Sequence, residues 1–337
     1  MRFLSKIRER QFAKKWGGAY NLSRAVLVGV LAAGCLMPGF AEAAPAPALV
    51  TKLDHYITDN DNLITVDRTE GENTATITAV NGNVGDKIDI SWMPGAGETS
   101  VEGCTINVNS ITIEPEIHIY GGEGTTAAKG NSVEINGGTI NAEVSGGFSQ
   151  YGKANNNKVS ISGGEFYYNV YGGYGATAAK GNSVEINGGT INSYVFGGFS
   201  ESGTAEGNSV EISGGTINDD VRVWGGWAES NSGNANGNSV IISGGTFNGN
   251  VRVWGGLSQS GTANKNRVII SGGKFSRCWV YGGYSLNGTA NRNQVIISDG
   301  TFDGNVVGGS STKEAKDNKI VLLGNNASYT FTNAHVR

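Results

Sequence analysis

The sequence predicts an all-β chain: a right-handed parallel β-helix, or solenoid, of about eight or more coils behind an N-terminal signal peptide. Three observations predict this fold. A unit of 25 to 30 residues recurs through residues 99–337, apolar residues alternate with polar ones inside each unit, and many of the 54 glycines occur as pairs at fixed positions. Because so short a unit cannot bury its apolar face alone, successive units must stack.

The N-terminal element, residues 1–43, has the pattern of a secretory signal peptide with an extended basic region. Seven basic residues precede a short apolar run, and Ala41-Glu42-Ala43 offers a small-residue cleavage site. The apolar run is shorter than the about 20 residues that a membrane-spanning helix needs. A lipoprotein site at Cys35 is the alternative. We therefore expect a secreted chain, located outside the cell or at the outer-membrane surface.

Net charge and cysteine content exclude two classes of protein. The chain has 25 basic and 29 acidic residues, and removal of the signal peptide takes away seven and two of them, which leaves a net charge of −9. An acidic surface repels phosphate backbones, so we expect no nucleic-acid partner. Only Cys104 and Cys278 remain, far apart in the repeat register. We therefore expect no disulfide framework.

Eight equivalent segments define the repeat, which reads N-x-V-x-I-[NS]-G-G-[TEK]-[IF], then V-x-G-G and a polar loop. Val133 and Ile135 alternate with Ser132 and Glu134, the period of a half-buried strand. The segments begin at Val133, Val159, Val184, Val210, Val240, Val268, Val295 and Ile320. We expect burial of Val133, Ile135, Ile140 and Val144 with their counterparts, and exposure of Glu134, Glu185 and Glu211.

Each unit contains two glycine pairs, and we expect each pair to form a corner. Gly137-Gly138 ends the first strand, because glycine reaches the positive φ that a tight corner needs. A second strand follows, and Gly146-Gly147 makes the next corner. Residues 44–98 depart from the repeat, and we expect them to form a linker and an irregular cap over the open edge of the solenoid.

One polar column is predicted to face inward. Asn131 has the same parity as Val133 and Ile135, so its amide should lie inside the coil, where stacked amides can bond to one another. Amides alone seldom hold a cation, so we interpret the column as structural. Its members are Asn131, Asn157, Asn182, Asn208, Asn238, Asn266, Asn293 and Asn318.

The recurrent N-x-V-x-I-x-G-G-T-[IF] and V-[aromatic]-G-G motifs, over about residues 100–323, resemble the passenger domains of autotransporters, the type V secreted proteins of Gram-negative bacteria. The long leader, with Lys14-Lys15-Trp16, is similar to their signal peptides. The resemblance implies display at the cell surface and adhesion, with a glycan or protein of a host or neighbouring cell as partner. Such proteins end in a membrane β-barrel, which does not follow before Arg337, so we expect a fragment or another export route.

A polysaccharide-acting lyase or glycosidase is the main alternative, since many β-helix proteins are such enzymes. Glycoside hydrolysis needs two carboxylates about 5–9.5 Å apart. The column of Glu134, Glu185 and Glu211, with Asp219-Asp220 nearby, supplies carboxylates. We interpret it as a solvated acidic face and expect no catalytic residue.

Metal and ice-binding sites are not predicted. The three histidines are scattered, and calcium-binding nonapeptide repeats need an aspartate where this chain has Thr139-Ile140-Asn141. We expect neither a metal nor another cofactor. An ice-binding face would need a flat threonine array, and Glu165 and Lys274 interrupt the threonine column.

The outward column of the first strand changes character along the chain. Ile241, Ile269, Ile296 and Val321 follow the glutamates and form a β-branched apolar stripe. Strand propensity alone explains such a stripe. The alternative is self-association, in which the stripe meets a second copy of the chain.

The candidate binding site is an aromatic column next to the second glycine pair. Its valine neighbours should point inward, so the rings should point outward, and coils spaced at about 4.8 Å allow them to stack with arginines. The stack either only steadies the sheet or forms a glycan- or protein-binding strip. The strip comprises Tyr171, Phe196, Trp224, Trp254 and Tyr281, with Arg222, Arg252 and Trp279 beside them.

Overall fold

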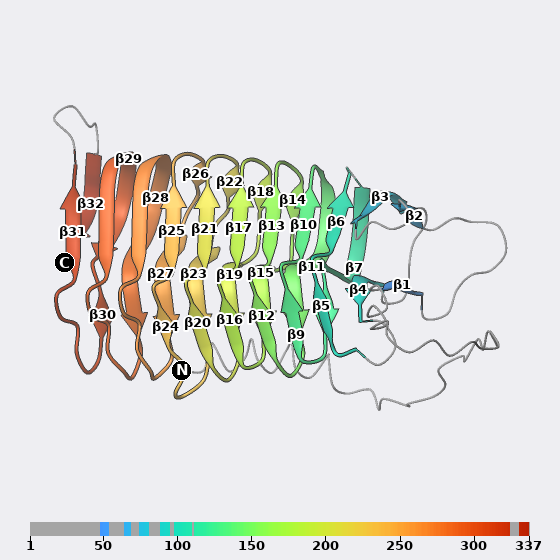
Figure 1. Ribbon diagram of the computed structural model, residues 1–337. Coiled ribbons are helices and arrows are strands. Elements are labelled where there is room, and N and C mark those ends of the chain that lie inside the picture. The colour runs from blue at the N-terminus through green and yellow to red at the C-terminus, as the bar shows by residue number, and fades with distance from the viewer. Residues whose placement is uncertain are drawn as a thin grey trace, which may run out of the picture. The chain divides into compact units, whose positions relative to one another are not determined.

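The computed structural model describes residues 48–53, 64–68, 74–80, 88–94, 98–109, 111–323 and 330–336. The signal peptide predicted for residues 1–43 lies outside these ranges. Residues 44–337 form one compact unit, and its strands wind around a common axis as a parallel β-helix of about 8 turns (Figure 1). The predicted fold class is therefore confirmed. The part of the chain described here contains no helix long and apolar enough to cross a membrane.

Most coils contain several short strands, whereas long strands run through the coils near the C-terminus, and each strand pairs in parallel with its equivalents in the neighbouring coils (Figure 1). The stacking gives the strands of the inner coils backbone partners on both sides, which a single unit lacks. The first strands are β6 (Thr105–Val108), β10 (Ser132–Ile135), β13 (Lys158–Ile161), β17 (Ser183–Ile186), β21 (Ser209–Ile212), β25 (Ser239–Ile242), the starts of β28 (Arg267–Ser285) and β29 (Gln294–Val307), and β31 (Lys319–Leu322).

The remaining strands complete the coil in the same register. The short second strands are β14 (Glu165–Phe166), β18 (Thr190–Ile191), β22 (Thr216–Ile217) and β26 (Thr246–Phe247). The third strands are β15 (Val170–Gly175), β19 (Val195–Ser200), β23 (Arg222–Ala228), β27 (Arg252–Ser258), β8 (Glu123–Gly124) and β30 (Ser310–Ser311). The second and third positions merge in β7 (Ile111–Tyr120), β11 (Gly138–Ser149) and β32 (Thr330–Val336). A separate sheet contains β5 (Ser100–Glu102), β9 (Ala127–Lys129), β12 (Lys153–Asn155), β16 (Ala178–Lys180), β20 (Thr204–Glu206) and β24 (Ala235–Asn236).

Antiparallel strands occupy the N-terminal edge of the solenoid. β3 (Thr74–Val80) and β4 (Ile88–Met93) continue the parallel ladders of β6 and β7. β2 (Ile64–Arg68) pairs antiparallel with β3, and β1 (Ala48–Leu53) pairs antiparallel with β4. These two pairings occupy backbone groups that would otherwise form an open sheet edge.

The main core follows the predicted parity. Val133, Ile135, Ile140 and Val144 are fully buried, as are their equivalents in most coils. Each such side chain contributes about 1.5–3 kcal/mol on burial. Glu134 and Glu211 are exposed as predicted. Glu185 is half-buried instead, because its carboxylate pairs with Lys158 Nζ of the preceding coil at 2.7 Å.

The predicted asparagine ladder is confirmed over its whole length. Asn157 Oδ1 accepts hydrogen bonds from the backbone N and from Nδ2 of Asn131, at 2.9 and 3.1 Å. Asn157 Nδ2 donates to Ala128 O at 3.0 Å and to Asn182 Oδ1 at 3.0 Å. The same pattern continues to Asn318. In each interior amide, both donor hydrogens and the acceptor oxygen thus form hydrogen bonds inside the protein, as a buried polar group requires.

The two glycine pairs serve different purposes, which corrects part of the sequence interpretation. Gly138 has a φ of 97°, as a tight corner requires. Gly146 and Gly147 instead lie inside β11, without positive φ. A Cβ atom on Gly147 would lie 2.4 Å from Asn157 Cγ. The second pair is therefore needed for close packing against the ladder and not for left-handed backbone.

Candidate functional site

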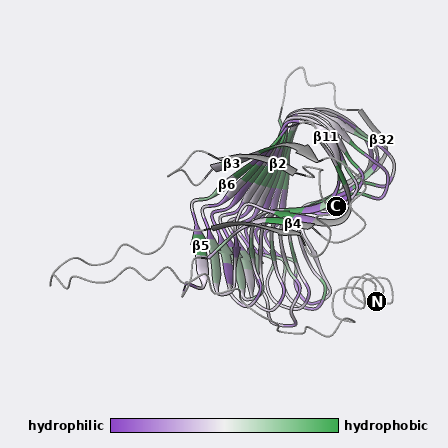
Figure 2. Cartoon of the chain, turned by 90° about the vertical axis from the view of Figure 1, so that its right-hand side faces the viewer, coloured by the Kyte–Doolittle hydropathy of each residue, from purple (hydrophilic) through white to green (hydrophobic). Residues whose placement is uncertain are grey.

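The coil has two lobes, and the candidate site lies where they join. Figure 2 looks along the solenoid and shows one lobe between β6 and β32, a second lobe beside β5, and β4 between them. The main core fills the first lobe. Ala205, Ala228 and Ala235 form a small core of their own. A third, largely aromatic cluster lies along the third strands and consists of Tyr171, Tyr174, Tyr194, Phe196, Phe199, Trp224, Trp227, Trp254, Leu257, Tyr281 and Tyr284. We call this cluster the aromatic elbow.

The predicted stacking in the elbow is confirmed. Tyr171, Phe196, Trp224, Trp254 and Tyr281 are neighbours in register on successive coils. Their ring centroids are 4.6, 4.6, 5.1 and 5.8 Å apart, and the planes of neighbouring rings differ by only 8–10°. The valine directly before each of these rings belongs to the main core. The rings therefore point away from that core, as parity predicts.

The predicted exposure of these rings is wrong for four of the five. Tyr171, Phe196, Trp224 and Trp254 are only 2–6% exposed, and Tyr281 alone is half-buried. A second column of large apolar side chains covers them. It is formed by the residue that follows the second glycine pair. Its members are Phe148, Tyr174, Phe199, Trp227, Leu257 and Tyr284. The ring column of the predicted strip is thus the buried column of a two-column cluster.

The second column was missed because the strand bends. Tyr171 and Tyr174 are three residues apart, so a regular strand would place them on opposite faces. Their ring centroids are instead 5.4 Å apart, and those of Trp224 and Trp227 are 5.1 Å apart. The available signal was the recurring aromatic residue directly after Gly-Gly in successive copies.

The accessible part of the predicted strip is the column of side chains two residues before the buried rings. Arg222, Arg252 and Trp279 are neighbours in register. The guanidinium of Arg222 lies over the ring of Tyr194, 5.5 Å from its centroid. Arg252 is exposed, Trp279 is 39% exposed, and the other two side chains are half-buried. We call this column the arginine ladder: Tyr194, Arg222, Arg252 and Trp279.

The charge of the elbow changes along its length. Near the N-terminal coils, Tyr120 Oη donates to Glu143 at 3.3 Å, and Tyr174 Oη donates to Glu201. Burial raises the pKa of Tyr174 well above its usual value, and the neighbouring Glu201 carboxylate raises it further. Burial lowers the pKa of the Arg222 guanidinium, and the adjacent charge of Arg252 lowers it further. Tyrosine–glutamate contacts thus lie beside the N-terminal coils of the elbow, and the two arginines lie on later coils.

Two of the carboxylates considered for catalysis, those of Glu185 and Asp219, have structural partners. Glu185 and Glu211 are neighbours in register, and Glu185 holds Lys158. Asp219 Oδ1 accepts from the backbone N of Asp220 at 3.0 Å and of Asn250 at 2.6 Å, which ties two loops together. These contacts agree with the interpretation of an acidic surface.

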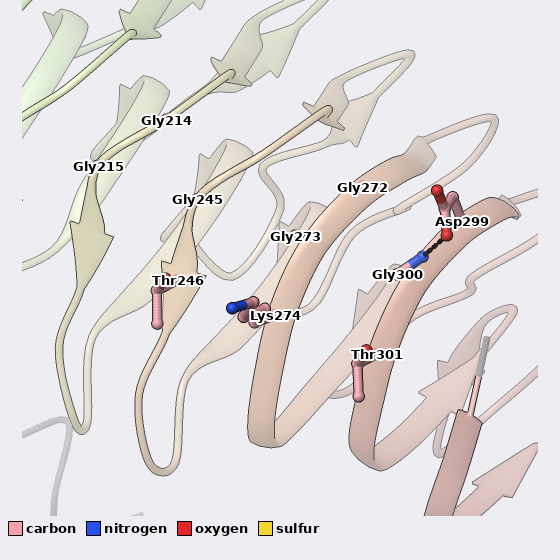
Figure 3. Close-up of a pocket in the computed structure, with 10 residues that line it drawn as sticks. All are labelled: Gly214, Gly215, Gly245, Thr246, Gly272, Gly273, Lys274, Asp299, Gly300 and Thr301. Atoms are coloured by element: carbon pink, nitrogen blue, oxygen red, sulfur yellow. Dashed lines mark hydrogen bonds between the residues drawn. The ribbon is translucent and has the colours of Figure 1, made fainter. Parts of the chain in front are cut away.

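A depression of about 640 Å³ follows the first glycine corner over four successive coils (Figure 3). Thr246, Lys274 and Thr301 line one side of it, and Asp299 Oδ1 accepts from the backbone N of Gly300 at 2.7 Å. The other lining residues are glycines, because the corner has no room for a Cβ atom at their positions. A Cβ atom on Gly272, for example, would lie 2.3 Å from Ser243 O. The depression thus follows from the geometry of the corner.

The apolar stripe predicted along the first strands is present in register. Ile241, Ile269, Ile296 and Val321 are neighbours on successive coils. Ile296 is 8% exposed and the others are half-buried. Contact of this stripe with a second copy of the chain stays a prediction.

Metal-ligand geometry is absent from the described residues, where no three His, Cys, Asp or Glu side chains are grouped for a metal ion. Cys104 and Cys278 are both buried free thiols. Burial raises the pKa of the Cys278 thiol, which keeps it protonated and unreactive.

Comparison of the chain with protein-family models, with curated proteins and with solved structures finds no match. The functional proposal therefore rests on the fold and on the geometry of the elbow.

Proposed function

We propose that this chain is a secreted, surface-displayed binding protein of the adhesin type, and that its ligand lies along the arginine ladder and the exposed edge of the aromatic elbow. One observation carries the proposal. Accessible aromatic and arginine side chains gather in a single strip, with Trp279 39% exposed beside Arg252, on top of a rigid buried ring stack. Aromatic and arginine side chains dominate the binding energy of known interfaces.

The elbow contains tryptophans at two positions where other coils have smaller apolar side chains. The indole N–H groups of Trp224 and Trp227 are buried without a hydrogen-bond acceptor among the described residues. Each unmet donor costs about 1–3 kcal/mol. Phe196 and Leu257 fill the same two columns without that cost.

The buried stack also fixes the side-chain conformations of the accessible strip before a ligand binds. Side chains whose rotamers are fixed by packing lose little entropy when a ligand binds. The guanidinium of Arg222 is held over Tyr194, and the Trp279 ring lies 6.2 Å from the Tyr281 ring at 14°. The resemblance to autotransporter passenger domains supports export and display.

A polysaccharide-acting enzyme is the second candidate, and one observation favours it. Glu201 and Glu229 are on successive coils beside the elbow, since Glu229 N bonds to Ser200 O at 2.9 Å. Strand spacing of about 4.8 Å is close to the carboxylate separation of about 5–5.5 Å in retaining glycosidases. Release of reducing ends from a polysaccharide panel, abolished by Glu201→Gln and by Glu229→Gln, would favour this function over simple binding.

The binding proposal is tested by replacing one accessible ring. We expect Trp279→Ala to lower the binding of the purified chain to host cells at least tenfold, because it removes the most exposed aromatic surface of the strip. Tyr151→Ala is the matched control, since Tyr151 is 62% exposed in a loop outside the elbow. Circular dichroism checks the fold of both variants. Equal binding by the two variants would refute the strip as the ligand site.

A further inference from the structure

We infer that the arginine ladder is a subsite for an acidic sugar, with the two arginines holding its carboxylate group and Trp279 supporting its ring. The inference rests on the proposed function and names the ligand class for it. It follows from three properties of the ladder: the like charges it places side by side, the aromatic side chains at both of its ends, and its straight path along the solenoid.

The like charges are the first property. Arg222 and Arg252 are direct neighbours in register, so their chain positions are about 4.8 Å apart. The whole chain has a net charge of −4, yet it gathers two positive charges here. Burial lowers the pKa of Arg222, and the nearby charge of Asp220 offsets part of that effect. Arg252, in contrast, takes part in none of the ion pairs among the described residues.

A carboxylate is the ligand group that such a pair fits best. The guanidinium group is planar and offers paired N–H donors that match the two oxygens of a carboxylate. Stacking on Tyr194 fixes the plane of the Arg222 guanidinium. One carboxylate between the two guanidinium groups would neutralise their mutual repulsion and accept hydrogen bonds from the exposed guanidinium of Arg252.

The aromatic ends of the ladder are the second property. Trp279 follows Arg252 in register, and Asn305 follows Trp279. A small side chain thus comes after the indole, which is 39% exposed. The C–H faces of a pyranose ring pack well on a flat indole. One coil spacing of about 4.8 Å lets a single sugar unit contact Arg252 with its carboxylate and Trp279 with its ring.

The third property favours a polymer of sugars over an acidic polypeptide loop. The ladder runs straight along the solenoid axis and repeats at the coil spacing, as a chain of identical units would. Polar groups on either side, such as the amide of Asn305 and the hydroxyl of Tyr281, are half-buried, and they can bond to sugar hydroxyls.

The test measures binding of the purified chain to polygalacturonate and to polysialic acid, with methyl-esterified polygalacturonate and polyglutamate as comparison polymers. We expect binding to at least one carboxylated polysaccharide, and at least tenfold weaker binding to the ester. Arg222→Gln with Arg252→Gln should lower the affinity at least tenfold, and Arg252→Lys, which keeps the charge and loses the planar fork, should lower it less. Arg267→Gln is the matched control, because Arg267 is exposed on the first-strand face.

Several results would overturn the inference: no binding to either carboxylated polysaccharide, an equal loss with Arg267→Gln, equal affinity for the ester, or tighter binding to polyglutamate, which would indicate an acidic polypeptide. The two proposals fail separately. If Trp279→Ala abolishes cell binding and the arginine variants do not, the ligand is not an acidic sugar but the binding strip stands. If cell binding survives both changes, the proposed function fails as well.

Discussion

The asparagine ladder allows the sharpest prediction on stability, the replacement of Asn208 by alanine. Asn208 lies in the middle of the ladder, and its side chain makes four hydrogen bonds. Oδ1 accepts from the backbone N and from Nδ2 of Asn182 at 3.0 and 2.9 Å. Nδ2 donates to Ala179 O at 2.9 Å and to Asn238 Oδ1 at 3.0 Å.

The expected magnitude follows from what the change leaves behind. The Asn182 backbone N–H loses its acceptor in a site without solvent, at a cost of about 1–3 kcal/mol, and the three other lost bonds contribute about 0.5–1.5 kcal/mol each. We therefore expect Asn208→Ala to lower the free energy of unfolding by about 3–7 kcal/mol. Asn187→Ala is the matched control. Its side chain is exposed and accepts one bond from Ser213 Oγ, so the same chemical change should cost about 0.5 kcal/mol or less.

The assay is urea denaturation followed by tryptophan fluorescence, with Trp224 and Trp227 reporting from the neighbouring third strands. Repeat arrays can unfold in parts, so hydrogen exchange of the strands on either side of Asn208 should accompany it. We expect faster exchange to centre on β17, β21 and β25. A loss within 1 kcal/mol of the Asn187→Ala control would refute the role given to the ladder.

Three further predictions concern the elbow and the second glycine pair. Trp224→Ala should lower the free energy of unfolding by about 3–5 kcal/mol because it opens a cavity, whereas Trp279→Ala should cost clearly less, which thermal melts would show. Gly198→Ala should destabilise by about 1–3 kcal/mol or more, since a Cβ atom there would lie 2.3 Å from Asn208 Cγ, and the same denaturation assay measures it. Burial raises the pKa of Tyr174, so below pH 10 the neutral ring contributes its full stability. Above pH 10 the unfolded chain loses this proton first, and stability should fall by up to about 1.4 kcal/mol per pH unit; Tyr174→Phe should reduce that slope in melts from pH 9 to 11.

The parts of the fold that depend on periodicity could be predicted from the sequence. Alternation placed Val133 inside and Glu134 outside, and the recurring asparagine, with the parity of the core residues, indicated the ladder that links Asn131 to Asn318. Such inferences hold because stacked coils superimpose equivalent residues, so that one copy of the repeat describes the others.

The parts that depend on a bend within a strand could not be predicted. Parity assigned Tyr171 to the surface, and regular alternation would place Tyr174 on the opposite face of the strand. The strand bends at the second glycine pair, and both rings meet in one cluster. Local sequence does not show how far a glycine pair turns the chain when its φ stays negative. The ion pair of Glu185 with Lys158 could not be predicted either, since it depends on the lengths and directions of two side chains.

Radical footprinting in the presence of ligand tests directly whether the ligand binds along the arginine ladder. Side-chain oxidation of Trp279, 39% exposed, is compared with that of Tyr151 and Tyr167, which are 62% and 45% exposed at other places on the coil. The rates are measured for the chain alone and after saturation with a carboxylated polysaccharide or with solubilised host-cell surface material that it binds. We expect strong protection of Trp279 and unchanged oxidation of both tyrosines. Bound ligand that leaves Trp279 as reactive as before would contradict binding along the arginine ladder.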